Sequence, residues 1–427
     1  MISQKDRNTI RELASKWMEW ASLPVMQERQ RLWQAVHDLK AERPVILVET
    51  AWIDGFVGAD ELRCEDPFLR QVEQNLRVTL RQAAELGDDL VIEPHYRLGW
   101  RMRFSDYGVP VETRAPLGAD KSIAYTFSFP IATPADIDRL RPRTIAVDRA
   151  ETQRRRALLE EIMGDILPVR LGNFDPFISE FDVGEYGDLG FTGNFFFGLT
   201  WQLYRFIGND RLLYWVYDQP AAVHRLMEYL LADRLALFGY FEQEGLLDFN
   251  TDSQMAGPRS YGFVSDLPAP GTGHPARLKD VWGWAESQEF EMISPGMYQE
   301  FVLPYLAKLS ARFGLVYYGC CERVDDRLPQ ILNAIPNLRS VSVSGWSNLA
   351  RTAELLGRKY VFSRKPTPAN ISGASPDWDG LEADMKNTRD VTRDSNLEIL
   401  FRDVYTINGD RARLRQWVDM TKRIFQI

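Results

Sequence analysis

Short apolar runs alternate along the chain with longer segments of helical periodicity. The runs are rich in Val, Ile and Leu and are apolar on both faces, which is typical of buried parallel strands. Eight strands with intervening helices predict a (β/α)8 TIM barrel, an α/β fold, and the alternative is an open doubly wound sheet with a second domain. The strands are expected at residues 44–49, 89–94, 167–171, 246–250, 315–318, 340–344, 359–363 and 397–401.

The first forty residues have a helical pattern. Residues 4–40 predict one or two helices that cover the bottom of the barrel, and a further amphipathic helix is expected over roughly 66–87. No internal repeat or linker-like tract follows. We therefore expect a single domain over residues 1–427, with a helical extension over 1–40 and the barrel over 41–427.

Three segments are too long to be plain connections between strand and helix. They cover residues 96–166, 172–216 and 250–294, and each follows the carboxyl end of a predicted strand. Barrel enzymes build their active sites at that end of the strands. We therefore expect these segments to roof a deep pocket.

Composition narrows the class of protein. The chain has 427 residues, of which 45% are hydrophobic, and a net charge of -9, which disfavours nucleic acid and anionic membranes as partners. No apolar run approaches the roughly 20 residues that span a bilayer, and the charged N-terminus is unlike a signal peptide. Three cysteines do not make a disulfide framework. We expect a cytoplasmic protein with reduced thiols that acts on a small molecule.

Polar residues that directly follow barrel strands are expected to converge on one cavity. Cys320 and Cys321 are the most distinctive, because thiolates bind zinc and act as nucleophiles, although two thiols packed between strand and helix explain the pair equally well. Adjacent residues point to opposite sides of a strand, so the two thiols need not both face the cavity. Because the pair lies at a barrel strand end, at least Cys320 is expected to face it.

The remaining candidates are taken from the other strand ends and from the aromatic insertion. About half are expected only to tie loops together through hydrogen bonds. Arg364 and Lys365 could hold a substrate carboxylate or phosphate, or could form a solvated loop end. We assign catalytic roles to Glu49, His95, Asn250, Asp252, Tyr318 and Asp403, substrate contacts to Trp52, Phe196, Trp346 and Arg364, and metal binding to Cys320, Cys321 and Glu322.

Two neighbouring segments carry a family resemblance. One has Ile293-Ser294-Pro295, then Phe301 and Pro304-Tyr305, and the other is the strand 316–321 that ends in the cysteine pair. Together they resemble the uroporphyrinogen decarboxylase-like superfamily, which includes the decarboxylase and zinc-dependent, corrinoid-linked methyltransferases. The resemblance covers residues from about 40 to 427 and implies a TIM barrel with a metal motif at strand five.

The chain also departs from both branches of this superfamily. The methyltransferases have His-x-Cys at strand five and a second Cys after strand eight, whereas here Tyr318 takes the His position and no Cys follows strand eight. A zinc site would therefore need Cys320, Cys321 and carboxylates such as Glu49, Glu322 or Asp403. The arginine-rich segment that follows strand one in the decarboxylase is replaced by the acidic segment 49–55, which argues against an eightfold carboxylated tetrapyrrole as substrate.

Three hypotheses follow. The first is methyl transfer between a small substrate and a corrinoid (cobalamin) carried by a partner protein, with a Cys320-bound zinc as Lewis acid. The second is a metal-independent decarboxylase or other lyase that acts on a carboxylated substrate with an Asp or Glu general acid. The third is a non-enzymatic component that binds a cofactor. The oligomeric state is left open, with a homodimer as the commonest arrangement.

Overall fold

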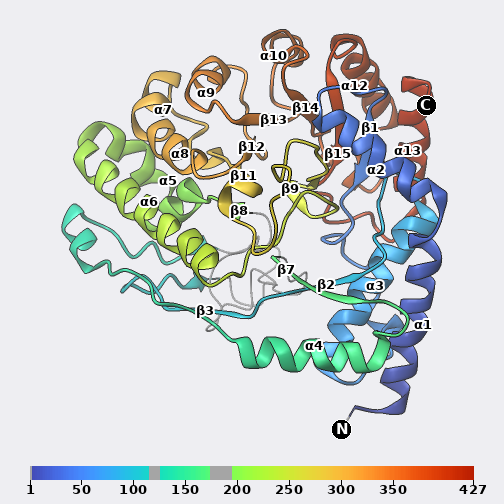
Figure 1. Cartoon of the computed structure of the whole chain (residues 1–427). Helices are drawn as coiled ribbons and strands as arrows, with labels where there is room; N and C mark the ends of the chain where they lie inside the picture. The colour runs from blue at the N-terminus through green and yellow to red at the C-terminus, as the bar shows by residue number, and fades with distance from the viewer. Residues whose placement is uncertain (1, 115–125, 174–194) are drawn as a thin grey trace.

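The computed structural model describes residues 2–114, 126–173 and 195–427 and has a mixed α/β fold. Its main sheet is entirely parallel and curls into a half-barrel, with α7–α10, α12 and α13 along its outer side (Figure 1). Neighbouring strands follow the chain order, as in a barrel. The strands, in spatial order, are β1 (Val45–Val48), β15 (Asn396–Phe401), β14 (Val361–Arg364), β13 (Leu338–Val343), β12 (Leu315–Tyr318), β11 (Trp282–Ala285) and β8 (Phe195–Phe196).

Five of the eight predicted strands are confirmed in this sheet. They are the first and the last four, which form β1 and β12–β15. The predicted third strand forms β7 (Val169–Gly172), which pairs in parallel with β2 (Tyr96–Gly99) in a separate two-stranded sheet. The ladders between described residues therefore do not close into an eight-stranded ring.

The predicted strands at 89–94 and 246–250 were wrong. In each segment a side chain replaces part of a strand ladder, although Asp89 N also donates to the Ile46 carbonyl at 2.7 Å. The Asp89 carboxylate accepts from Ile46 N at 2.8 Å, and Asn250 bonds both the N–H and the carbonyl of Trp282 at 2.8 and 3.1 Å. These segments follow the sheet edge without forming strands.

β11 lies inside a segment that the sequence analysis assigned to a loop. Its sequence Trp-Gly-Trp-Ala has none of the branched residues that mark the other strands. Glycine is required here by close packing, because a Cβ on Gly283 would lie 2.8–2.9 Å from the rings of Phe313 and Phe197. Packing of aromatic rings thus defines this strand, rather than β-propensity.

The helical N-terminal extension is confirmed as α1 (Gln4–Ala21) and α2 (Pro24–His37), and the next predicted helix as α3 (Pro67–Glu85). Of the two helices in the extension, α2 packs against the sheet, next to β1 and β15. Helix α1 packs on α3 and α4. No helix in the described part of the chain is long and apolar enough to cross a membrane. The other helices are α4 (Arg149–Met163), α5 (Leu199–Asp218), α6 (Pro220–Gln243), α7 (Pro295–Phe301), α8 (Leu303–Ser310), α9 (Leu328–Ala334), α10 (Leu349–Leu356), α11 (Ala369–Ser372), α12 (Trp378–Val391) and α13 (Ala412–Phe425).

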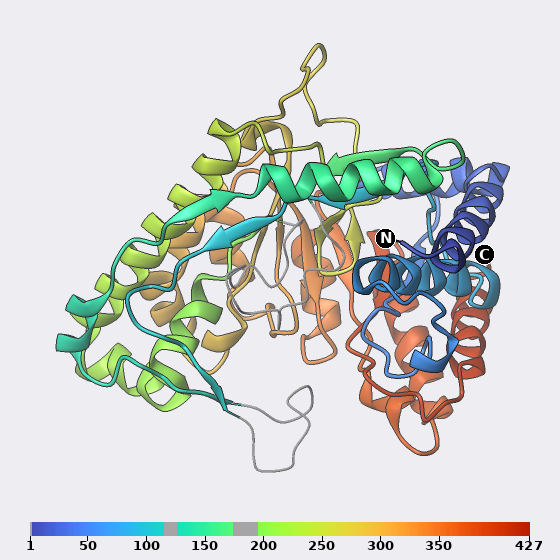
Figure 2. The ribbon, with the colours of Figure 1, turned by 90° about the horizontal axis from the view of Figure 1, so that it is seen from below.

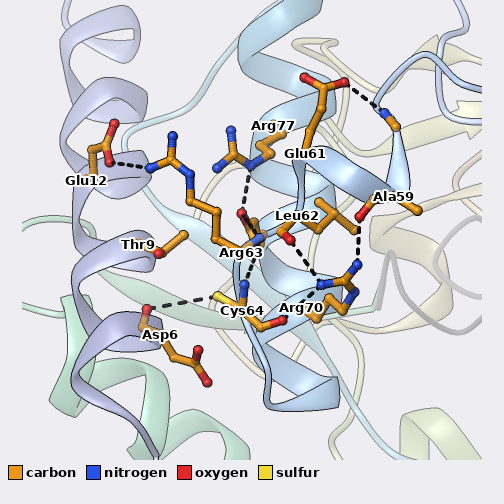
Figure 3. A network of polar contacts seen from close by, with 12 residues as sticks. Asp6, Thr9, Glu12, Ala59, Glu61, Leu62, Arg63, Cys64, Arg70 and Arg77 are labelled. Atoms are coloured by element: carbon orange, nitrogen blue, oxygen red, sulfur yellow. Dashed lines mark hydrogen bonds and ion pairs between the residues drawn. The ribbon is translucent and has the colours of Figure 1, made fainter.

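The third cysteine, Cys64, lies in the polar network that joins α1 to α3, away from the cysteine pair (Figure 3). The Asp6 carboxylate accepts from the N–H groups of Glu65 and Asp66 at 3.0 and 3.1 Å, and Glu73 accepts from Cys64 N at 2.7 Å. Burial and the neighbouring Glu73 raise the pKa of the Cys64 thiol well above its ordinary value. Cys64 is therefore an unreactive packing residue.

The segment between β2 and α4 crosses the molecule from α1 to α6 (Figure 2). It contains β3 (Met102–Phe104), β4 (Thr113–Arg114), β5 (Thr126–Phe127), a 3-10 helix (Pro134–Arg139) and β6 (Ile145–Val147). A buried ion pair joins it to α6, because Arg143 donates to both carboxylate oxygens of Asp233 at 2.8 and 2.6 Å. Later in the chain, β9 (Met255–Gly257) and β10 (Ser260–Tyr261) form a small antiparallel pair.

Replacing Asp233 by Leu should lower the free energy of unfolding by about 3–5 kcal/mol, because the Arg143 charge would stay buried without its partner. The double variant Arg143→Met/Asp233→Leu should be destabilised less than Asp233→Leu alone. Chemical denaturation of the three proteins measures this difference. If the double variant loses as much free energy of unfolding as Asp233→Leu, or more, Arg143 and Asp233 do not stabilise the fold as a buried pair.

Candidate functional site

Side-chain alternation separates the interior of the half-barrel from its helix-covered side. On β14, Phe362 packs in the core beneath the helices, whereas Val361 packs with Val45 and Leu47 of β1 on the interior side. The same alternation, continued past the strand ends, places Glu49, Lys365 and Arg402 on the interior side. Their contacts agree with this placement.

A strand-end cluster forms where β1, β12 and β15 end. We use this name for Glu49, Cys320, Cys321, Arg402 and Asp403. The two thiol sulfurs lie 3.5 Å apart, and Cys321 Sγ lies 3.2 Å from Asp403 Oδ2. Arg402 contacts three other members of the cluster. Its Nη1 lies 3.4 Å from Cys320 Sγ, its Nη2 3.1 Å from Asp403 Oδ1 and its Nε 3.5 Å from Glu49 Oε2. Four of these five residues are predicted site residues, and the structure brings them together.

Arg402 is buried and charged at the centre of the cluster. Burial disfavours this charge, but the carboxylates of Glu49 and Asp403 and the Cys320 thiol outweigh it and raise the pKa of Arg402 well above its ordinary value. Among the described residues, its Nε has an ion-pair neighbour in Glu49 but no hydrogen-bond partner. The guanidinium therefore keeps hydrogen-bonding capacity for an anion.

Backbone geometry turns Cys320 towards Arg402 and Cys321 towards Asp403. Gly319 has φ +98°, and a Cβ at this position would lie 2.9 Å from that of Ser342. This turn ends the alternation of β12, so the expectation that the two thiols point to opposite sides was wrong. Asp403, opposite them, has φ +59°, a left-handed conformation that Asp tolerates better than most residues.

The two thiols differ in exposure. Cys321 is exposed, whereas Cys320 is buried. The hydrogen bond with Cys321, together with burial, raises the pKa of the Cys320 thiol well above its ordinary value, although Arg402 opposes the shift. Cys320 is therefore a neutral thiol near pH 7, and Cys321 is the accessible one.

Lys365 lies beside the cluster on the same interior side. Its Nζ donates to the hydroxyls of Tyr317 and Ser363 at 2.8 and 2.5 Å, and in the described structure no carboxylate lies within 4.0 Å to form an ion pair with it. Burial, and to a smaller degree the charge of Arg402, lowers the pKa of Lys365 to about 7, while Glu398 opposes the shift. Lys365 was a candidate for holding a substrate anion but is not among the predicted site residues. Arg402 and Tyr317 are not among them either.

Several predicted site residues lie on the helix side or serve as backbone partners. Tyr318 Oη bonds Ser287 Oγ and Tyr298 Oη at 2.8 and 2.9 Å, away from the thiols. The Glu322 carboxylate accepts from Ser287 N and Cys320 N at 3.0 and 2.8 Å. The Arg364 guanidinium donates to Asp384 and Thr388 of α12. The structure gives these three residues packing and loop-holding contacts.

A second polar cluster contains His95 and Asp252, around Arg97. Arg97 forms an ion pair with Asp252 and lies 3.7 Å from Glu93, while His95 Nε2 lies 4.0 Å from Glu93. Burial, together with the charge of Arg97, lowers the pKa of His95 to about 4, so this ring is neutral near pH 7. Asn250, also predicted as catalytic, is occupied with the backbone of Trp282.

The aromatic candidates are spread over several strand ends. Trp52 and Trp346, in the loops after β1 and β13, are 40% and 69% exposed. Phe196 on β8 packs against Trp284 with ring centroids 4.4 Å apart. Two parts of the predicted pocket roof, residues 115–125 and 174–194, lie outside the described residues.

A buried acidic pair after β11 was missed because β11 itself was missed. Thr200 Oγ1 lies 3.2 Å from Glu286 Oε1 and 2.6 Å from Glu289 Oε2. A hydroxyl has one proton to donate, so one of the two carboxyls must itself carry a proton if both contacts are hydrogen bonds. Burial and the nearby carboxyls of Glu289 and Glu322 raise the pKa of Glu286 well above its ordinary value. Had β11 been predicted, alternation from Trp282 and Trp284 past the strand end would have indicated Glu286.

The predicted zinc ligands do not fit a zinc ion in this arrangement. The thiols are close to each other and to Asp403, but the Arg402 guanidinium lies directly beside Cys320, Asp403 and Glu49. A fixed positive charge there repels a divalent cation. Within residues 2–114, 126–173 and 195–427, no group of three or more His, Cys, Asp or Glu side chains has a geometry that could hold a metal ion.

Comparison of the chain with models of known protein families and with curated proteins finds no match. The resemblance in residues 293–305 and 316–321 therefore stays a prediction. The function has to be argued from the site itself.

Native protein treated with a thiol reagent such as 5,5'-dithiobis(2-nitrobenzoate) should react rapidly at one cysteine, Cys321, because Cys64 and Cys320 are buried thiols with raised pKa values. Unfolded protein should react at all three. Cys321→Ser should remove the rapid phase and Cys64→Ser should leave it unchanged. A rapid phase that survives Cys321→Ser would contradict this placement.

Proposed function

We propose that the chain is a metal-independent lyase that acts on a small carboxylated substrate at the strand-end cluster. The observation that carries this proposal is the position of Arg402, a buried cation at the centre of the strand ends with unused hydrogen-bonding capacity. Arginine binds a carboxylate through two parallel hydrogen bonds. Lys365, whose Nζ is held by hydroxyls, adds a second basic group on the same side.

The groups of the cluster have separable roles in such a reaction. Arg402 would bind and orient the substrate carboxylate, since its charge does not vary near pH 7. When a carboxyl group leaves as CO2, the electrons of the broken bond stay on the substrate carbon, which then takes up a proton. Asp403 is partly exposed beside the thiols and could deliver that proton as a general acid.

The finer fold assignment belongs to the same proposal. A uroporphyrinogen decarboxylase-like (β/α)8 barrel would have its remaining wall next to β1 and β8, the two edges of the main sheet. The segment at 89–93 runs beside β1, with Asp89 N bonded to the Ile46 carbonyl at 2.7 Å. This contact supports an irregular second strand at that edge.

Zinc-dependent methyl transfer to or from a corrinoid partner protein is the second candidate. It is favoured by the convergence of two thiols with Asp403, and zinc would supply Lewis-acid activation of the substrate. The position of Arg402 speaks against it, because the thiols would have to rearrange around a metal. Elemental analysis separates the two candidates.

Purified protein should release CO2 from at least one member of a panel of 2-oxo, 3-oxo and aromatic carboxylic acids, with activity unchanged by EDTA. Arg402→Lys should lower kcat/KM by about 10²–10³, because a point charge replaces the planar donor set. Arg323→Lys, at an exposed arginine in the loop after β12, is the matched control and should retain activity.

One result would replace the lyase with the methyltransferase. It is zinc bound stoichiometrically, lost in Cys320→Ala, together with no CO2 release from any acid of the panel. Stoichiometric zinc with a normal lyase rate after chelation would instead assign the metal a structural role.

A further inference from the structure

We propose that Lys365 is a nucleophile that forms an imine with the carbonyl group of a 2-oxo or 3-oxo carboxylic acid. This inference rests on the proposed lyase function and names its substrate class. It is carried by the geometry around Nζ, which is buried on the interior side of the half-barrel, with hydroxyl partners and next to Arg402.

Among the described residues, Lys365 has no carboxylate within ion-pair distance. Lysine is rarely fully buried unless it is paired with a carboxylate. In this part of the chain Nζ donates to the hydroxyls of Tyr317 and Ser363, and the residue is 5% exposed. Hydroxyl groups can donate to a neutral amine as well as accept from an ammonium, so this environment tolerates both protonation states.

The surroundings of Nζ are arranged for a carbonyl acid. Arg402 and Lys365 follow neighbouring parallel strands, β15 and β14. Arg402 could bind the carboxylate of the substrate while Lys365 faces its carbonyl carbon. The charged or titratable groups that act on Lys365 electrostatically are Glu398, Arg402, Cys320 and Glu49, in addition to the Tyr317 phenol.

Tyr317 is positioned by a close backbone approach. A Cβ on Gly257 of β9 would lie 2.2 Å from the Tyr317 ring, so glycine leaves the space that the ring occupies. Burial raises the pKa of Tyr317 well above its ordinary value, so the phenol keeps its proton. In the structure it donates that proton to Ser363 Oγ at 2.7 Å, and in the reaction it would turn to donate to the carbonyl oxygen.

The reaction balances without a further reactant. The Nζ lone pair attacks the carbonyl carbon, a C–N bond forms, and the carbonyl oxygen leaves as water. In a 3-oxo acid the bond to the carboxyl carbon then breaks, CO2 leaves, and the electron pair moves to the iminium nitrogen to give an enamine. The enamine carbon takes up a proton, and addition of water releases the ketone and the free amine.

Reductive trapping tests this inference on the protein as it exists. The full chain is incubated with pyruvate or with acetoacetate and sodium cyanoborohydride, and the modified lysines are mapped by mass spectrometry of peptides. We expect the reduced adduct at Lys365 in preference to exposed lysines. Lys365→Arg should abolish this adduct. Lys359 is an exposed lysine just before β14, and Lys359→Arg should leave the adduct unchanged.

The pH dependence of trapping is a second readout on the wild-type protein. Because the pKa of Lys365 is lowered to about 7, the neutral amine accumulates as the pH rises through 7, and the trapping rate should then level off. The rate at an ordinary lysine would keep rising towards 10.5.

The outcomes separate this inference from the lyase proposal. CO2 release from acetoacetate that leaves no adduct, and that persists in Lys365→Arg, overturns the imine and keeps the lyase. An adduct at Lys365 without CO2 release supports the imine and counts against the lyase. Absence of an adduct at Lys365 with both probes, or labelling only of exposed lysines, overturns the imine.

Discussion

The buried guanidinium of Arg402 links the fold of this protein to its site. A buried charge is costly unless it is paired, and its partners Glu49, Cys320 and Asp403 come from the ends of three different strands. β1 and β15 are adjacent, whereas β12 approaches from across the curl of the sheet. The charge is therefore satisfied only when the half-barrel has formed with its correct strand order.

The same charge shapes the chemistry around it. It pairs with the carboxylates of Glu49 and Asp403, and together with burial it disfavours a proton on Lys365. Two thiols, an amine and a carboxylate thus lie close to the same buried guanidinium. Such groups can transfer protons and attack carbonyl carbons.

Predicted residues lie in the strand-end cluster where strand assignment was right and alternation was followed. Glu49 follows the interior-facing positions 45 and 47 of β1, and it lies in the cluster. Tyr318 and Arg364 were chosen in place of Tyr317 and Lys365, one residue away and on the opposite face. Ser363 and Glu398 are polar residues within apolar strands, and they could have marked the interior face. Lys365 and Arg402 lie an even number of residues further along the same strands, so alternation places them on that face as well.

The sequence by itself determined the parallel α/β class, the N-terminal helices, five of the strands and the place of the cysteine pair, because these follow from local periodicity. Tertiary structure decided which strands join the sheet: β11 depends on aromatic rings packed against Gly283, and the segment 246–250 is held by Asn250 instead of a ladder. It also decided that Cys320 meets Arg402 and Cys321 meets Asp403, since the left-handed turn at Gly319 and the curl of the sheet bring together residues some eighty positions apart.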